Sequence, residues 1–134
     1  MNIKKLAGLA VTTLALNMII LSDASAVSID VKCETRGTSR SKISIDGKAF
    51  GAGIYRARAQ SGTAVVWSKA FQRPVAGQIE FDYDSNPADI RAGATAVSPS
   101  FIKNNRVTGN IYSFNSTTRT YTLRASVTDT CKAR

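Results

Sequence analysis

Two cysteines, Cys33 and Cys131, stand near the two ends of this 134-residue chain and are the only cysteines in it. The segment before Cys33 has the features of an export signal, and exported proteins mature in oxidising compartments where cysteine pairs form disulfides. We therefore predict a Cys33–Cys131 bridge. Closing a loop of about 100 residues contributes on the order of 4–5 kcal/mol in the chain-entropy model, which is a large share of the stability of a small domain.

The predicted export signal covers residues 1–26. Two lysines at positions 4 and 5 precede an apolar run over residues 6–21, and Ala24-Ser25-Ala26 forms a small-x-small cleavage site. Polar residues interrupt the run, and it is shorter than the ~20 apolar residues of a membrane-spanning helix. We expect cleavage after Ala26, no membrane span in the mature protein, and a periplasmic or secreted location.

Alternation of apolar and polar residues places both cysteines on terminal strands. Ile29, Val31 and Cys33 share one parity, and the residues between them are charged. Such a period of two is typical of a strand with one buried face. Near the other terminus the same pattern predicts that one core-facing set contains Tyr121, Leu123, Ala125, Val127 and Cys131.

The rest of the mature chain is predicted to form short strands separated by turns. Turn signals occur at Asp46-Gly47, Ser61-Gly62 and residues 115–118. About seven strands at roughly ten-residue spacing indicate one all-β domain over residues 27–134, an immunoglobulin-like two-sheet β-sandwich. A small barrel is the alternative. The predicted strands between the terminal ones are 42–46, 54–60, 63–69, 78–84 and 107–114.

One acidic segment interrupts the strand pattern. Its first three oxygen-bearing side chains are spaced like the first ligands of a calcium loop, but Pro87 occupies the position where such a loop needs glycine. The second interpretation is a short helix capped by Asn86, with Pro87 in its first turn and Gly93 just past its end; Asp82 and Asp84 would then face solvent on the preceding strand. The candidate calcium ligands are Asp82, Asp84, Asn86 and Asp89.

The chain is basic, with 18 Lys and Arg against 9 Asp and Glu. Arg56 and Arg58 share the outward parity of one predicted strand, and Arg124 that of the last. If these strands are neighbours, the three guanidinium groups could hold the anionic groups of an acidic polysaccharide or lipid headgroup. The alternative is that the positive charge serves solubility and keeps edge strands unpaired.

The sequence does not favour catalysis. It contains no histidine, the commonest general base, and its two cysteines are expected to be oxidised. Trp67, Phe71 and Phe114 are either core residues or an outward binding patch, and the sequence leaves the orientation of Trp67 open. We predict a non-enzymatic binding or structural module without a cofactor, apart from the candidate calcium. Its partner would be an acidic polymer or another envelope protein.

Overall fold

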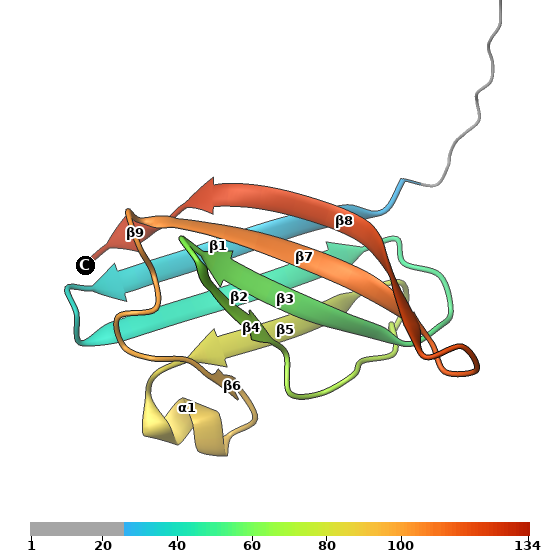
Figure 1. Ribbon diagram of the computed structural model, residues 1–134, viewed down its shortest axis with the longest axis horizontal. Coiled ribbons are helices and arrows are strands. Elements are labelled where there is room, and N and C mark those ends of the chain that lie inside the picture. Colours follow the sequence, from blue (N-terminus) through green and yellow to red (C-terminus); the bar gives the residue numbers. More distant parts are fainter. Residues whose placement is uncertain (1–25) are drawn as a thin grey trace, which may run out of the picture.

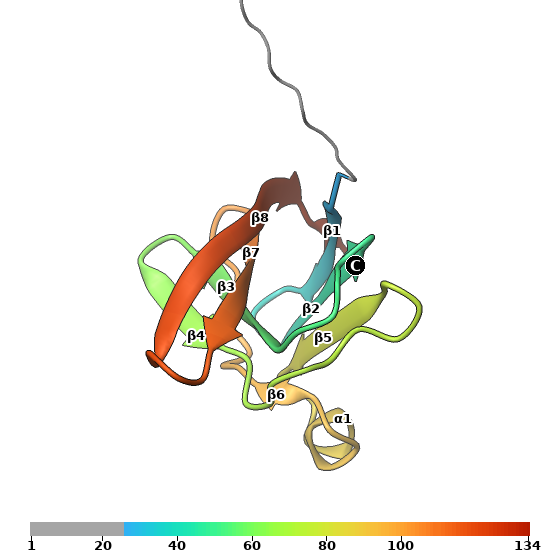
Figure 2. The same cartoon turned by 90° about the vertical axis from the view of Figure 1, so that its right-hand side faces the viewer.

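The computed structural model of the protein describes residues 26–134, which form two β-sheets packed face to face as a β-sandwich (Figure 1). Figure 2 shows the two layers edge-on, with the helix α1 (Pro87–Arg91) beside one end of the five-stranded sheet. The predicted all-β two-sheet architecture is confirmed. Except for Ala26, the predicted export signal lies outside the described residues.

The five-stranded sheet has the order β6-β5-β2-β1-β9, and the four-stranded sheet has the order β4-β3-β7-β8. Seven of the nine strands correspond to segments that the alternation predicts. The other two, β6 and β9, have two residues each and pair in parallel with their neighbours. Strands this short have no periodicity that a sequence could reveal. The strands of the first sheet are β1 (Ser28–Arg36), β2 (Arg40–Lys48), β5 (Ile79–Asp84), β6 (Thr95–Ala96) and β9 (Lys132–Ala133), and those of the second are β3 (Tyr55–Ser61), β4 (Ala64–Trp67), β7 (Arg106–Asn115) and β8 (Thr120–Thr130).

The two sheets contribute side chains of unequal size to the core. The five-stranded sheet supplies large buried residues: Val31, Ile43, Ile45, Ile79, Phe81 and Tyr83. The four-stranded sheet also supplies Tyr55, Val107 and Ile111, but its inward positions between them are small: Ala57 and Ala59 on β3 and Gly109 on β7. A Cβ atom on Gly109 would lie 2.5 Å from Cγ2 of Val31 and 3.1 Å from Cδ1 of Ile45. The sheets therefore approach closely where the second sheet has almost no side chain.

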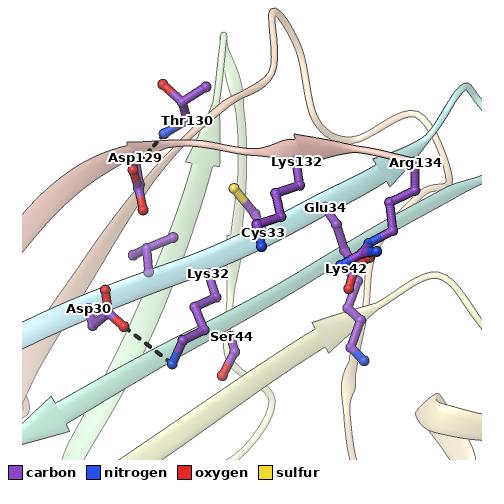
Figure 3. A pocket seen from close by; sticks show the side chains of 11 residues that line it. Asp30, Lys32, Cys33, Glu34, Lys42, Ser44, Asp129, Thr130, Lys132 and Arg134 are labelled. Atoms are coloured by element: carbon purple, nitrogen blue, oxygen red, sulfur yellow. Dashed lines mark hydrogen bonds and ion pairs between the residues drawn. The ribbon is translucent and has the colours of Figure 1, made fainter.

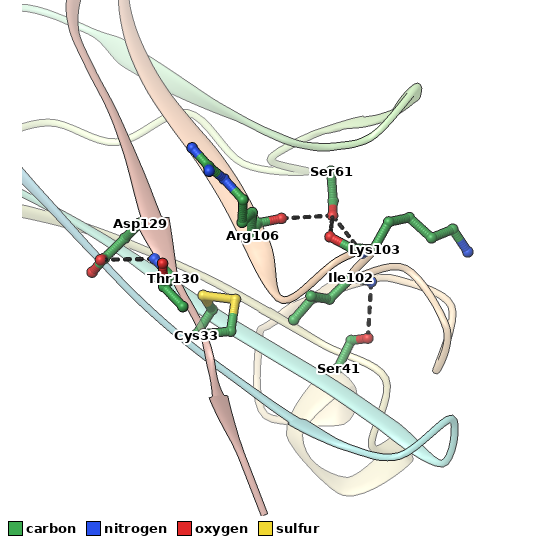
Figure 4. Close-up of a disulfide and its surroundings, with 9 residues drawn as sticks. Cys33, Ser41, Ser61, Ile102, Lys103, Arg106, Asp129 and Thr130 are labelled. Atoms are coloured by element: carbon green, nitrogen blue, oxygen red, sulfur yellow. Dashed lines mark hydrogen bonds between the residues drawn. A yellow bond between two sulfur atoms is a disulfide. The ribbon is translucent and has the colours of Figure 1, made fainter.

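The predicted disulfide is present and links the two sheets. After β8 the chain leaves the four-stranded sheet, passes through Cys131 and joins the five-stranded sheet as β9. Cys131 is bonded to Cys33 on β1, with a Cα–Cα distance of 4.6 Å, and both cysteines are buried. Figure 4 shows the bridge beside the segment before β7, which the hydroxyls of Ser41 and Ser61 hold in place by hydrogen bonds.

The predicted turn at Asp46-Gly47 is wrong. Gly47 lies within β2 and pairs with Ile29 on one side and Ile79 on the other. It is buried, and a Cβ there would come within 2.6 Å of the Phe50 ring. The glycine thus provides room for an aromatic ring, and the chain reverses after it, where Ala49 has a positive φ of 64°.

The predicted core set on the last strand is also wrong in its first half. The register between β7 and β8 shifts: Ile111 pairs with Ala125, and Tyr112 pairs with Leu123. Arg124 is left as an extra residue in a β-bulge, which reverses the alternation on one side of it. Ala125 and Val127 pack against the core as expected. Tyr121 and Leu123 instead pass to the outer face of the sheet.

Replacing Cys33 by Ser should lower the free energy of unfolding by about 4 kcal/mol. Without the disulfide the unfolded chain is no longer cross-linked, so its conformational entropy is higher. Urea unfolding monitored by circular dichroism measures this change. The double variant Cys33→Ser with Cys131→Ser controls for effects of a free thiol and should be destabilised similarly. Unchanged unfolding of both variants would contradict a stabilising role for the bridge.

Gly109→Ala should destabilise the protein by about 1–3 kcal/mol, since the added methyl group overlaps Val31 and forces the sheets apart. Gly51→Ala is the matched control, because a Cβ at Gly51 has no atom within 4 Å. Thermal melting of the two variants tests the difference. Equal melting temperatures would show that the sheets separate without cost at this position.

Candidate functional site

The outer face of the four-stranded sheet carries large side chains. Ala57, Ala59 and Ile111 point into the core, so their neighbours in sequence point outward. Cross-strand pairing aligns Arg56 with Tyr112, and Arg58 with both Trp67 and Asn110. We call this surface the arginine–aromatic face. Its members are Arg56, Arg58, Trp67, Phe71, Tyr112, Phe114, Tyr121 and Leu123.

Five aromatic rings form one connected cluster on this face. The Tyr121 ring lies at its centre, with ring centroids of Phe114 at 4.9 Å, Trp67 at 5.1 Å and Tyr112 at 6.3 Å. Trp67 is on β4 and Tyr121 is on β8, the two edge strands of the sheet. Neighbouring strands are about 4.8 Å apart, so these edges would be about 14 Å apart in a flat sheet. The contact of the two rings therefore means that the face is concave here.

Both arginines of β3 lie against these rings. The Arg56 guanidinium carbon is 5.5 Å from the Trp67 ring centroid and 5.2 Å from that of Phe71, within the range of cation–π attraction. Arg56 Nε donates to the Ser68 carbonyl at 2.7 Å, and Nη1 donates to the Tyr121 hydroxyl at 3.2 Å. These contacts hold Arg56 in one orientation.

Arg58 is held by rings alone. Its guanidinium carbon is 5.7 Å from the Trp67 ring centroid and 5.6 Å from that of Tyr112. Its Nε is buried and has no hydrogen-bond partner among residues 26–134. Arg58 also takes part in no ion pair within that range, so its charge is not neutralised by the described protein.

The two sheets differ in their acidic residues. The strands of the four-stranded sheet contain a single carboxylate, that of Asp129 on β8. Asp129 pairs with the core residue Val107 and lines a groove next to β1, so it does not belong to the arginine–aromatic face. The strands of the five-stranded sheet carry six acidic residues: Asp30, Glu34, Asp46, Glu80, Asp82 and Asp84. The arginine–aromatic face is thus positive and free of carboxylates.

Several apolar groups of the face are exposed. Leu123 is 51% exposed, Phe71 43% and Tyr121 38%. The orientation of Trp67, which the sequence leaves open, is outward, because Trp67 pairs with Arg58 and alternates with the inward Val66. These exposed apolar side chains are neighbours, and patches of this kind are common at interaction surfaces.

Of the three arginines predicted to bind anions, the structure brings two together. Arg56 and Arg58 are neighbours on β3. Arg124 is the extra residue of the bulge, and its Nε donates to Ser113 Oγ at 2.9 Å. It has no cation–π contact with the rings of the face. Periodicity could not place Arg124, because a bulge adds one residue without a marker in the sequence.

The acidic segment forms the predicted capped helix. Asn86 is the N-cap of α1 and accepts hydrogen bonds from the amides of Ala88 and Asp89, and Pro87 occupies the first turn. Asp84 is buried, in contrast to its predicted solvent exposure. Arg40 from β2 causes this burial, since its guanidinium donates to both Asp84 oxygens, at 3.0 and 2.8 Å, and to Asp89 at 2.9 Å.

Three of the four candidate calcium ligands therefore have protein partners. Arg40 bonds two of the four, Asp84 and Asp89, and the Asn86 side chain caps the helix. Asp82 lies on the exposed side of β5. Within residues 26–134 no group of three acidic, histidine or cysteine side chains is arranged to hold a metal ion. The calcium site stays a prediction, and an ion there would have to displace Arg40.

An open groove of about 520 Å³ lies elsewhere, beside β1 and β9 (Figure 3). Some of its charged side chains pair with one another: Lys32 lies 3.4 Å from Asp30, and Arg134 contacts Glu34. The groove therefore contains carboxylates beside its basic groups, unlike the arginine–aromatic face. The arginine–aromatic face, whose arginines lack acidic partners, is the better candidate for a binding site.

No protein-family model, no curated protein and no solved structure matches this chain. None of the helices in residues 26–134 is long and apolar enough to cross a membrane.

The Arg40–Asp84 ion pair should make stability depend on acid pH. Burial opposes ionisation of Asp84, but hydrogen bonds from Arg40 and from the Asn86 amide outweigh it and hold the pKa of Asp84 below its ordinary value. A lowered folded-state pKa stabilises the protein fully above the unfolded pKa of about 3.9, and this stabilisation is lost as the pH falls through the folded pKa.

Asp84→Asn should therefore cost about 3 kcal/mol at pH 7, since it leaves a partly buried guanidinium without its main partner. It should also make the decrease in the free energy of unfolding below pH 4 smaller. Urea unfolding at several pH values measures both effects. Asp30→Asn is the control and should change stability little, because the Asp30–Lys32 pair is exposed and screened by solvent. Equal costs for the two variants would contradict this assignment.

Proposed function

We propose that the protein is an exported, non-enzymatic binding module that holds a polyanion on its arginine–aromatic face, in the periplasm or outside the cell. The export signal and the disulfide support this location. The absence of histidine from the whole sequence and the use of both cysteines in the bridge support a role without catalysis.

One observation carries the polyanion assignment: two adjacent arginines lie on a face that has no carboxylate. Within the described residues Arg56 and Arg58 form no ion pair. By contrast, Arg40 and Lys32 on the other sheet each contact two carboxylates. Charge that merely kept the protein soluble would not need to be separated in this way, whereas an anion-binding face does.

The surroundings of these arginines favour strong anion binding. Rings cover parts of both guanidinium groups, and a partly desolvated cation attracts an anion more strongly than one in bulk water. The Ser68 and Tyr121 contacts fix Arg56 before a ligand arrives, so less side-chain entropy is lost on binding. A guanidinium can then bind a carboxylate or phosphate with two parallel hydrogen bonds.

The fold is further assigned to the immunoglobulin-like type. The order β5-β2-β1 in one sheet and β4-β3-β7-β8 in the other corresponds to strands E-B-A and C′-C-F-G of such sandwiches. The bridge differs from that of antibody domains, which joins strands B and F, because here it joins the first strand to the end of the last long strand. Sandwiches of this type serve many functions, so the proposal rests on the face and not on the fold.

Arg58→Gln should weaken binding to heparin at least tenfold, because a hydrogen bond to a charged group contributes about 1.5–3 kcal/mol. Fluorescence titration is suitable, since Trp67 is the only tryptophan of the chain and lies on the face. The binding should weaken with added salt.

Arg36→Gln is the matched control: it removes the same charge from an exposed position on β1, on the other sheet, and should change the affinity less than twofold. Melting curves of both variants check that they are folded. Equal affinities of Arg36→Gln and Arg58→Gln would indicate non-specific attraction by net charge and would contradict the proposed face.

A further inference from the structure

We infer that the polyanion is an acidic glycan, a chain of sugar units bearing uronate carboxylates, which lies across the arginine–aromatic face. This inference rests on the proposed function and names its ligand class. Three features of the face support it: exposed ring surfaces, an adjoining row of hydroxyl and amide groups, and an arginine between the two.

The exposed rings can stack against sugars. Phe71 and Tyr121 are both exposed, their centroids are 6.5 Å apart, and their planes differ by 15°. Two nearly parallel rings offer an apolar surface to the C–H groups of a sugar ring, and aromatic side chains provide such contact area at a small entropic cost. Leu123 extends this apolar surface along β8.

Hydroxyl and amide groups continue the face beyond the rings. On one row the exposed Ser126 hydroxyl donates to the buried Oδ1 of Asn110 at 2.6 Å, and on the next the hydroxyls of Thr108 and Thr128 are 2.6 Å apart. Gln60 on β3 pairs with Thr108 and completes the second row. Such neutral donors and acceptors suit the hydroxyl groups of sugars. A polyphosphate chain has no such row of hydroxyl groups.

Arg58 lies between the exposed rings and the polar rows. It pairs with Trp67 on one side and with Asn110 on the other. A carboxylate bound to its guanidinium would bring the attached sugar over the rings, and the next sugar over the polar rows. From Arg56 to Gln60 the strand extends about 13 Å, at roughly 3.3 Å per residue, so the face accommodates more than one sugar unit.

The same features do not favour a lipid surface. The exposed rings and Leu123 lie in a concave region of a sheet, where the edge residues Trp67 and Tyr121 meet. A bilayer binds apolar side chains that can enter its interfacial region. The hydroxyl groups beside Arg58 instead suit a polymer of sugars.

The test uses the full chain, exported and purified in its oxidised form, and follows Trp67 fluorescence. The probes are hexagalacturonate, the neutral maltohexaose, linear polyphosphate, and vesicles of phosphatidylglycerol in phosphatidylcholine. Hexagalacturonate should bind at least tenfold more tightly than each of the other three. Tyr121→Ala should weaken hexagalacturonate binding at least fivefold and leave polyphosphate binding unchanged.

Two further variants separate stacking from other effects of Tyr121. Tyr121→Phe removes the hydroxyl that accepts from Arg56 but keeps the ring, so it should retain hexagalacturonate binding within twofold. Val75→Ala removes a 78% exposed apolar side chain outside the face and should have no effect. A Tyr121→Phe variant as weak as Tyr121→Ala would overturn the stacking argument.

The remaining outcomes distinguish this inference from the proposed function. If hexagalacturonate and polyphosphate bind equally, and Arg58→Gln weakens both, the glycan is wrong and the polyanion face stands. Tighter binding of the vesicles would replace the glycan by a lipid headgroup. If none of the anionic probes binds, both the inference and the proposed function fail.

Discussion

The close approach of the two sheets at Gly109 is the contact on which the rest of the structure depends. Val31 and Ile45 of the five-stranded sheet fill the space that a side chain on Gly109 would occupy. Ala57 and Ala59 continue this small-residue inner surface along β3. Apart from Tyr55, which lies in the core, the aromatic residues of the four-stranded sheet lie on its outer face.

Two local irregularities then give this surface its composition. The bulge at Arg124 moves Tyr121 and Leu123 from the core side to the outer side of β8, next to Tyr112. Curvature of the sheet brings Tyr121 into contact with Trp67, which lies on the opposite edge strand. The bridge at Cys131 fixes the end of β8 to β1, so the strand that carries Tyr121 is tied covalently to the other sheet.

The two sheets also differ in how their charged side chains are paired. In the five-stranded sheet Lys32 and Arg40 pair with acidic side chains, and the buried Arg40–Asp84 contact anchors α1 through Asp89. In the four-stranded sheet Arg56 and Arg58 pair with rings, which stabilise a cation without neutralising it. One sheet therefore contains the ion pairs of the described residues that stabilise the fold, and the other carries two arginines that form no ion pair within residues 26–134.

The sequence by itself determined the disulfide, because the chain has only two cysteines behind an apparent export signal. It also determined most strand positions, the number of strands that indicates two sheets, and the cap at Asn86, because these depend on a period of two or on neighbouring residues. It failed at Gly47 and at Asp84, whose surroundings are set by Phe50 and by Arg40 on a neighbouring strand. Only the tertiary structure decided that Arg56 and Arg58 lie against rings while Arg124 does not. The reason is physical: a bulge changes the alternation without changing the composition, and the contacts of a ring depend on strands that are far apart in the chain.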